Sequence, residues 1–389
     1  MSNKALVVVS KPPYPLHDGA AIAEYQVIEF LYEMGYILDV IYISDKEDYD
    51  TVKNGIGKFC HKIVHKKITK NRAYLNVLIG LFCNRKPLQV NYYYSRKLKA
   101  EIKKKQGEYD LIYSCTIRTA EYTKDLLNNK KVIDYVDALS ANYKVAKRRT
   151  RGLWHWIYVL ESKRCKKYES KIFYLYNKRR IISDIDKINI LNSGGFKENE
   201  LTVIGNYTPI PNAVRKEPNN HNITFVGVMS YEPNIHAVIY FVKEILQKVI
   251  AVLPDVKFYI VGKNPNSDVI QLSSKNVIVT GFVDDPNKYL DNSAITVTPM
   301  LSGSGLQNKI IQAMARGVCV ITTPKGFEGM PSDEGQPIIC KNANEMAQKI
   351  IDFLSNISLR KEYGHKSVEY IKKYYSRTVI FNKFKFFLE

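Results

Sequence analysis

The fold is decided by residues 294–323, AITVTPMLSGSGLQNKIIQAMARGVCVITT. The pattern predicts a buried strand, a glycine loop, an amphipathic helix and a second buried strand. Such a unit places the loop and the start of the helix at the carboxyl edge of a parallel sheet, where open α/β folds bind phosphorylated ligands. Gly303 and Gly305 allow the backbone to approach a ligand closely, and Lys309 adds a cation just inside the helix.

Two familiar phosphate loops do not fit this stretch. A Walker A loop that starts at Gly303 needs glycine at position 308 and Ser or Thr at position 310, but the chain has Asn308 and Ile310. A dinucleotide fingerprint that starts at the same glycine also fails at Asn308. The loop therefore favours neither an ATPase nor an NAD enzyme. The competing interpretation is an ordinary strand-to-helix turn with a surface lysine.

Strand and helix patterns alternate on both sides of a polar, proline-containing segment at residues 212–222. The alternation predicts two doubly wound α/β domains that face a cleft. We expect a first domain over residues 1–212, a second over 213–372, and a C-terminal helix over 373–389 that packs back on the first. The predicted strands of the second domain are 223–228, 257–261, 276–280, 295–299 and 318–322, and its predicted helices are 233–249, 310–316 and 343–354.

Composition narrows the class of protein. The chain has 389 residues, a net charge of +20 and six cysteines, none of them at metal-ligand spacing. No apolar stretch is long enough to cross a bilayer, so we expect a cytoplasmic protein. We also expect no metal and no bound cofactor, because no pair of metal-binding aspartates stands at the end of a strand. The positive charge is concentrated in residues 1–200, and residues 51–100 contain 12 Lys or Arg and no acidic residue. Such a bias indicates a polyanionic surface as a partner.

Two basic stretches stand beside apolar or aromatic residues. HKIVHKKITKNR (residues 61–72) precedes AYLNVLIGLFC (residues 73–83), and KRRTRGLWHWIY (residues 147–158) contains Trp154 and Trp156. Cations beside such aromatics suit an anionic membrane surface. No RNA-binding motif is present, so we expect no nucleic-acid partner. A solvated helix face is the alternative for either stretch.

Five motifs together resemble the group 1, family 4-type glycosyltransferases. They are PPYPLHDGAAIAEYQ (12–26), ITFVGVMSYEPNIHAVIYF (223–241), FYIVGKNP (258–265), VIVTGFVDD (277–285) and GSGLQNKIIQAMARG (303–317). The resemblance covers nearly the whole chain. It implies the GT-B fold, in which two Rossmann-like domains hold a nucleotide-sugar donor in the C-terminal domain and the acceptor in the N-terminal domain.

Carried over by position, the resemblance implies a set of donor-binding residues. Gly227 and Met229 would lie near the diphosphate, Phe282 and Val283 would line the base pocket, and Gln312 would stand near the ribose. The loop that would face the sugar and phosphates consists of Ser304, Gly305, Leu306, Gln307, Asn308 and Lys309. Gly19, in the opening loop, would let a ligand approach the first domain, although a tight turn explains it equally well.

The chain departs from the family at one important place. The family's usual pair of glutamates, eight residues apart, falls on Ser304 and Gln312, so neither carboxylate is present. Gln312 can still hydrogen-bond a ribose diol, and Lys309 resembles the lysine of a subgroup of the family. Catalysis by carboxylates at these two positions is ruled out.

Four polar residues of the first domain and one of the second are further candidates. His17, Asp18 and Asp134 are predicted to contact the acceptor, and Asp137 to support the transition state where many relatives have a histidine. Helix capping is the competing role for Asp134 and Asp137. Glu328 would contact sugar or acceptor, or else be a turn carboxylate. We assign catalytic roles to Asp137, Lys309 and Glu328.

The resemblance implies a glycosyltransferase on the inner face of a membrane. It would move a sugar from a nucleotide-sugar to a lipid-linked or glycan acceptor in polysaccharide assembly, with retention of configuration and without a metal. A nucleotide-sugar 2-epimerase shares this architecture and is one alternative. A non-catalytic protein that binds sugar or nucleic acid is another, because both glutamates are missing.

Overall fold

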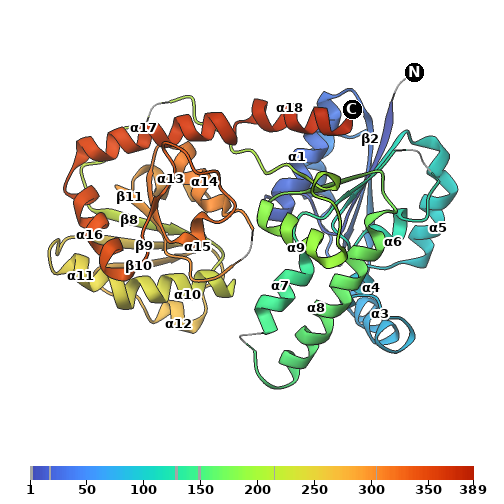
Figure 1. Ribbon diagram of the computed structural model, residues 1–389, viewed down its shortest axis with the longest axis horizontal. Helices are drawn as coiled ribbons and strands as arrows, with labels where there is room; N and C mark the ends of the chain where they lie inside the picture. Colours follow the sequence, from blue (N-terminus) through green and yellow to red (C-terminus); the bar gives the residue numbers. More distant parts are fainter. Residues whose placement is uncertain (1–2, 17–18, 128–129, 148–149, 214, 304) are drawn as a thin grey trace. The chain divides into compact units, whose positions relative to one another are not determined.

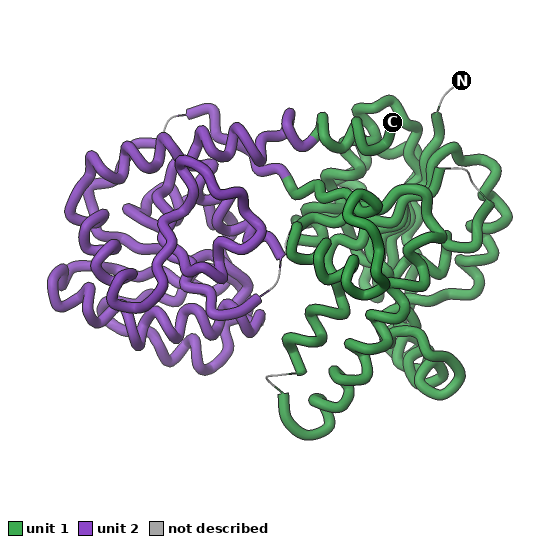
Figure 2. Tube along the Cα trace, in the orientation of Figure 1, with its two compact units in different colours: residues 1–206, 381–389 green, residues 207–380 purple. Residues whose placement is uncertain are grey.

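The structure, a computed structural model, describes residues 3–16, 19–127, 130–147, 150–213, 215–303 and 305–389. The chain forms two compact units, residues 1–206 with 381–389, and residues 207–380 (Figure 2). Each unit is built on one parallel sheet with helices packed against it, which is the α/β class expected from the sequence (Figure 1). The first unit ends a few residues before the expected boundary at 212, and the segment that returns to it starts at Phe381 and not at 373.

The first unit contains a seven-stranded sheet of order β3-β2-β1-β4-β5-β6-β7. All residues of the first strand after Lys4 are buried, because a parallel sheet is covered on both faces and its central strands must be apolar throughout. The strands are β1 (Lys4–Val9), β2 (Ile37–Ser44), β3 (Lys62–Lys67), β4 (Leu111–Cys115), β5 (Lys131–Asp134), β6 (Lys178–Ile181) and β7 (Thr202–Val203).

Helices connect these strands and bury the apolar residues of the sheet in separate clusters. One cluster includes Ile133, Phe173 and Ile181, and another includes Val8 and Ile112. The helices of the first unit are α1 (Gly19–Glu33), α2 (Tyr49–Ile56), α3 (Lys70–Cys83), α4 (Leu88–Tyr92), α5 (Arg96–Lys105), α6 (Ala120–Thr123), α7 (Leu139–Lys147), α8 (Gly152–Phe173) and α9 (Asp184–Gly194), with short 3-10 turns η1 (Gly57–Phe59), η2 (Gln106–Glu108) and η3 (Glu198–Glu200).

The second unit contains a six-stranded parallel sheet of order β10-β9-β8-β11-β12-β13. Its strands are β8 (Asn222–Val226), β9 (Lys257–Val261), β10 (Val277–Gly281), β11 (Ile295–Thr298), β12 (Cys319–Thr322) and β13 (Ile338–Ile339). Its helices are α10 (Glu232–Tyr240), the π-helical η4 (Phe241–Leu246), α11 (Gln247–Ile250), α12 (Ser267–Ile270), α13 (Asn287–Asp291), α14 (Asn308–Ala315), α15 (Pro324–Phe327), α16 (Ala343–Leu354) and α17 (Ile357–Tyr374), and α18 (Arg377–Leu388) follows them.

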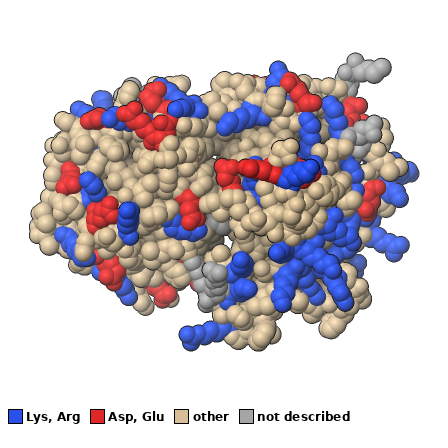
Figure 3. All heavy atoms as spheres, in the orientation of Figure 1, with Lys and Arg blue, Asp and Glu red and all other residues tan. Residues whose placement is uncertain are grey.

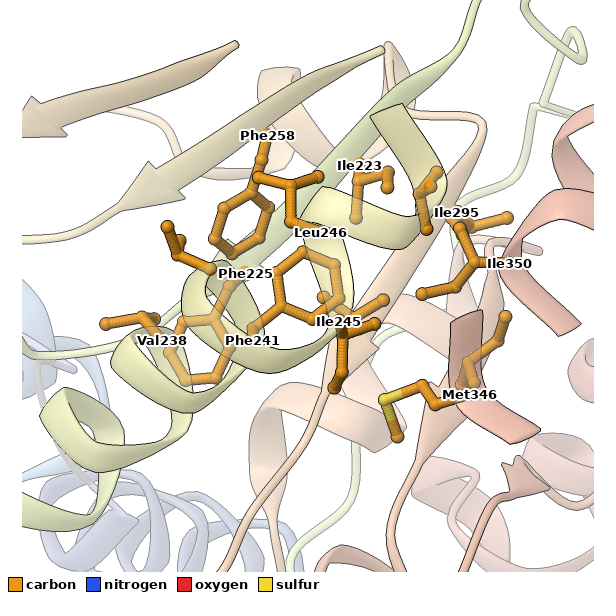
Figure 4. Packing of buried hydrophobic residues seen from close by; sticks show 14 of the residues in the cluster. Ile223, Phe225, Val238, Phe241, Ile245, Leu246, Phe258, Ile295, Met346 and Ile350 are labelled. Carbon is orange, nitrogen blue, oxygen red and sulfur yellow. The ribbon is translucent and has the colours of Figure 1, made fainter. Parts of the chain in front are cut away.

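The main core of the second unit lies between its sheet and the helical run from α10 to α11. Phe225 and Phe258 from the strands meet Phe241 from the π-helical turn, and Met346 and Ile350 of α16 close the cluster (Figure 4). The ring centroids of Phe241 and Phe258 are 4.5 Å apart. The single helix expected over residues 233–249 is thus one helical run with a π-helical turn in its middle, and that turn carries core side chains.

The last helix returns the chain to the first unit. Phe384 of α18 is fully buried, and its ring centroid lies 5.5 Å from that of Phe30 in α1. The ammonium of Lys178 on β6 donates a hydrogen bond of 2.6 Å to the carbonyl of Phe387. None of the described helices combines the length and the apolar content needed to cross a bilayer.

Candidate functional site

The candidate site lies where the strand order of the second sheet reverses. The chain runs outward from β8 to β9 and β10 and then returns to β11, which lies beside β8. Ligands of open α/β sheets bind outside the carboxyl ends of the strands at such a switch point. The loop after β8 and the glycine loop after β11 both start there, so the topology brings the predicted donor-binding residues to one edge of the sheet.

The turns after β8 and β9 are in close backbone contact. A Cβ on Gly262, whose φ is +151°, would lie 1.7 Å from the carbonyl oxygen of Gly227. A Cβ on Gly227 would lie 2.6 Å from the side-chain nitrogen of Asn234 in α10, and this nitrogen donates a hydrogen bond of 3.0 Å to the carbonyl of Val228. A side chain at Gly262 would collide with the backbone of Gly227, so glycine at this position lets the two turns pack against each other at the edge of the sheet.

The loop after β11 keeps backbone and hydroxyl donors beside the start of α14. Gly303 and Gly305 have φ angles of +123° and +73°, which side chains disfavour. Ser302 is buried, and its hydroxyl has no hydrogen-bond partner within the described part of the chain. Gln307 stands at the N-cap of α14 and makes no capping bond to the first turn. A helix start of this kind attracts anions through its N–H groups.

Lys309 in the first turn of α14 is the cation of the site. Its ammonium donates a hydrogen bond of 2.6 Å to the side-chain oxygen of Asn234 and lies 3.4 Å from that of Gln307. It also lies 5.0 Å from the ring centroid of Phe225. Among the described residues Lys309 has no carboxylate partner, and burial lowers its pKa to about 7. An anionic ligand at this loop would supply the missing counter-charge.

The remaining predicted residues of the second unit differ in their surroundings. Met229 is fully buried in the core cluster, so only its backbone, whose N–H bonds the carbonyl of Lys263, is near the turn. Phe282 is 65% exposed, and Val283 is half-buried. Gln312 is half-buried on α14, one turn beyond Lys309. Glu328 forms an ion pair with Lys325, which favours the turn carboxylate over a catalytic group.

In the first unit, Asp134 is paired inside the core, which favours a structural role over the predicted contact with the acceptor. The residue is fully buried at the end of β5. Its carboxylate forms an ion pair of 2.6 Å with Arg180 and accepts a hydrogen bond of 3.0 Å from the hydroxyl of Tyr113. A carboxylate enclosed in this way is not available to a ligand, because removing either partner would leave a buried charge uncompensated.

Asp137 lies three residues beyond the end of β5 and is half-buried. Its carboxylate accepts a hydrogen bond of 2.6 Å from the side chain of Asn142, and burial raises its pKa although Arg118 opposes the change. It does not cap α7, because the first N–H groups there are bound by Asp186 and Glu169. The structure leaves Asp137 at the carboxyl edge of the first sheet.

The other predicted residues of the first unit can be placed only in part. Gly19 begins α1, and its carbonyl accepts a hydrogen bond of 3.4 Å from the side chain of Asn206. His17, Asp18 and Ser304 lie outside the described residues. Within the described part of the chain, no group of three or more His, Cys, Asp or Glu side chains is placed to hold a metal ion.

Sequence reasoning missed Asn234, Gly262 and Ser302. Asn234 and Gly262 lie within the quoted motifs at 223–241 and 258–265, but nothing in those motifs indicates that both turn toward Gly227. Ser302 precedes the glycine loop directly, and a small polar residue next to two loop glycines is a signal that could have found it.

Residues 220–356 match the model of the glycosyl transferases group 1 family. Two curated proteins are related along the sequence. An uncharacterized 44.6 kDa protein in the cps region of Klebsiella pneumoniae is 24% identical over 400 residues, which cover 97% of this chain and 98% of the relative. The poly(ribitol-phosphate) alpha-N-acetylglucosaminyltransferase of Staphylococcus aureus (strain COL) is 27% identical over 214 residues, 52% of this chain and 42% of that enzyme.

Solved structures match the fold of the whole chain. TarM superposes with a TM-score of 0.73 at 13% identity. The superposition covers 100% of this chain and 99% of the TarM chain. Anabaena Alr3699/HepE, solved in complex with UDP and glucose, superposes with a TM-score of 0.67 at 14% identity over 99% of both chains. The likeness to solved structures shows the GT-B fold, and the match over residues 220–356 shows a glycosyltransferase domain of the group 1 family.

Proposed function

We propose that the protein transfers a sugar from a uridine diphosphate sugar to a lipid-linked or glycan acceptor in the assembly of a surface polysaccharide. The observation that carries the proposal is the placement of Lys309, without a carboxylate partner among the described residues, beside the glycine loop and the start of α14. The UDP in the HepE complex supports the choice of uridine. The two curated relatives, a protein in a cps region and an enzyme named for a polymer acceptor, support polysaccharide assembly.

The chemistry follows from the charge that develops on the leaving group. As the bond between the anomeric carbon and the diphosphate oxygen breaks, the diphosphate gains negative charge. Lys309 and the N–H groups at the start of α14 would stabilise this negative charge. In other enzymes a divalent metal ion has this role. The acceptor hydroxyl would attack the anomeric carbon on the face from which the diphosphate leaves and give its proton to the departing phosphate oxygen. The configuration would then be retained, and no metal would be required.

Release of nucleoside diphosphate tests the proposal. We would incubate the protein with UDP-, GDP- and dTDP-sugars, with and without a bacterial lipid and glycan extract, and measure the diphosphate released. Wild-type protein should release UDP in an acceptor-dependent manner, and Lys309→Ala should lose most of that activity. Lys248→Ala is the matched control, because Lys248 on α11 also donates to an asparagine oxygen but lies on the exposed surface.

Other results would reverse the conclusion. Conversion of the donor sugar without release of diphosphate would indicate the 2-epimerase. Binding of UDP without turnover of any donor would indicate a non-catalytic binding protein. Equal activity of Lys309→Ala and the control would mean that the donor site lies elsewhere.

The membrane-facing part of the proposal is supported by an exposed face of α3. Leu75, Leu78, Ile79 and Phe82 follow helical spacing and are 45%, 56%, 48% and 84% exposed. A contiguous apolar surface of this kind is uncommon on a soluble protein. Lys and Arg side chains gather on the first unit near α4 and α8 (Figure 3), and α3 itself carries the exposed Lys70 and Arg72.

Vesicle binding tests this surface. The protein should sediment with vesicles that contain anionic phosphatidylglycerol and much less with phosphatidylcholine alone, because each basic residue near the surface contributes ~1 kcal/mol of attraction. Phe82→Ser should weaken this binding. Phe386→Ser is the matched control, because Phe386 on α18 is exposed to a similar degree, 81% against 84%. Equal binding of the two variants would remove α3 from the proposal.

A further inference from the structure

The first sheet has a switch point of its own. The chain runs from β1 outward to β2 and β3 and returns to β4, which lies beside β1. Ser10 follows β1 and Thr116 follows β4, and their hydroxyl oxygens are 3.4 Å apart. The residues after β1, β4 and β5 therefore surround the position in this unit that corresponds to the donor loop in the other.

The backbone at this edge adopts conformations that side chains disfavour. Thr116 and Val136, after the neighbouring strands β4 and β5, have φ angles of +64° and +62°. A β-branched residue in this region is an outlier, and such strain is concentrated at ligand sites, where the surrounding structure holds it. Asp137 directly follows Val136 in the sequence, and Arg118 lies two residues after Thr116.

Arg118 is held in position at this edge by neutral groups. Its Nε donates a hydrogen bond of 2.6 Å to the side-chain oxygen of Gln89, whose nitrogen in turn donates 2.7 Å to the hydroxyl of Tyr143. The guanidinium carbon lies 6.0 Å from the ring centroid of Tyr93. Within the described residues Arg118 forms no ion pair, although it is half-buried. The two Nη groups form no hydrogen bond with the described residues, and Asp137, which interacts with Arg118 electrostatically, is not at ion-pair distance from it.

We propose that Arg118 binds a phosphate ester of the acceptor at this edge, and that Asp137 beside it receives the acceptor's hydroxyl. The inference rests on the proposed function. A guanidinium fixed at Nε offers its two Nη groups as a fork, which matches two oxygens of a phosphate. Asp137, held by Asn142 and coupled electrostatically to Arg118, is the candidate for a hydrogen bond to a hydroxyl of the same molecule. A neutral glycan would offer the two Nη groups of Arg118 no anionic oxygen at hydrogen-bond distance.

A binding experiment tests the anion site without turnover. Ligand-observed NMR with glycerol 3-phosphate should show binding to wild-type protein, and glycerol should bind much more weakly. Arg118→Gln should lose the phosphate-dependent binding, Arg118→Lys should keep part of it, and Arg96→Gln, on the exposed start of α5, should behave as wild type. Equal binding by Arg118→Gln and wild type, or no binding by wild type, would overturn the proposal.

A turnover experiment separates this inference from the proposed function. Acceptors would be a poly(glycerol phosphate) oligomer, a polyprenyl diphosphate sugar and an uncharged oligosaccharide, with UDP release as the readout. Arg118→Gln should raise KM for a phosphate-bearing acceptor by about 10- to 100-fold and leave UDP affinity unchanged. The acceptor that supports UDP release shows whether the bound phosphate belongs to a polymer or to a lipid.

The possible failures are distinguishable. If wild-type protein releases UDP but Arg118→Gln has an unchanged acceptor KM, or loses activity equally on charged and uncharged acceptors, the assignment of Arg118 is wrong and the proposed function stands. If glycerol 3-phosphate binding depends on Arg118 but no donor is turned over, the anion site stands and the proposed function is wrong.

Discussion

At the scale of single residues, the site depends on charges that burial has made costly. Lys309 contacts an amide oxygen, an aromatic ring and a thioether within the described structure, and none of these replaces the water that its ammonium loses. Asp134 differs from Lys309, because its buried charge is compensated by an ion pair with Arg180. Two charged residues at the carboxyl edges of parallel sheets thus have different surroundings.

Lys309 should couple the binding of diphosphate to the uptake of a proton. Its pKa in the free protein is lowered to about 7, so the side chain is mostly neutral at pH 8. A bound diphosphate favours the charged form, so we expect uptake of about one proton at pH 8 and an affinity for UDP that falls about tenfold per pH unit above 7. Calorimetry in buffers of different ionisation enthalpy measures the uptake. The same uptake in Lys309→Met would contradict this assignment.

Glu169 should make the stability of the first unit depend on pH. Burial raises its pKa from 4.5 to about 7, so the folded state binds more protons than the unfolded state between these values, and stability falls as the pH rises from 4.5 to 7. Glu169→Gln keeps an oxygen for the N–H of Ser140 and carries no charge. At pH 8 it should raise the free energy of unfolding by up to roughly 3 kcal/mol.

The control for Glu169→Gln is its own pH dependence. The gain in thermal stability should disappear near pH 4.5, where the wild-type carboxyl is also protonated. A gain of the same size at both pH values would mean that packing, and not charge, is responsible.

At the scale of elements, the two units differ in how their loops are built. In the second unit, glycines let the turns after β8 and β9 touch, and the start of α14 is left open beside them. In the first unit, the start of α7 is covered by Glu169 from α8 and Asp186 from α9. An open helix start at one switch point and a covered one near the other agree with a donor site in the second unit only.

Gly262→Ala tests the close contact between the two turns. The new Cβ would lie 1.7 Å from the carbonyl oxygen of Gly227, so the turn must move and both stability and UDP binding should be lost. Gly281→Ala is the matched control, because its φ is also positive at +68° but no atom lies within 4 Å of the new Cβ. That control should cost only about 1 kcal/mol and keep UDP binding. Thermal unfolding and calorimetry measure both effects.

At the scale of the whole molecule, the chain leaves the first unit near Asn206 and returns to it at Phe381. The returning segment supplies core residues, because Phe384 contacts Phe30 and lies 6.1 Å from the ring centroid of Tyr113. The first unit is therefore complete only after the last residues of the chain are present. Its folding should depend on residues that follow the entire second unit in sequence.

Phe384→Ala should destabilise the first unit by ~3–5 kcal/mol, because it empties a fully buried site. Thermal unfolding followed by calorimetry should show the transition of the first unit shifted to lower temperature, while bound UDP still protects the second. Phe386→Ala, at an 81% exposed position of the same helix, should leave both transitions in place. A shift of equal size in both variants would mean that helix propensity, and not burial, is measured.

The sequence by itself determined the fold class, the central strands of both sheets, and the position of the glycine loop before α14. Buried parallel strands are continuous apolar runs, and two glycines before an amphipathic helix are recognised from neighbouring residues alone, so both signals are local. The edge strand β3 and the helices around it were not predicted, because an edge strand with four charged or histidine residues among six resembles a basic surface.

Only the tertiary structure decided which polar residues are available to a ligand. Asp134 and Arg180 are separated by 46 residues, and Lys309 and Asn234 by 75, yet these contacts assign one carboxylate to the core and keep one ammonium at the edge of the sheet. Local patterns report which residues are apolar and how they are spaced. They do not report which distant side chain satisfies a buried charge, because that partner is chosen by the packing of the whole unit.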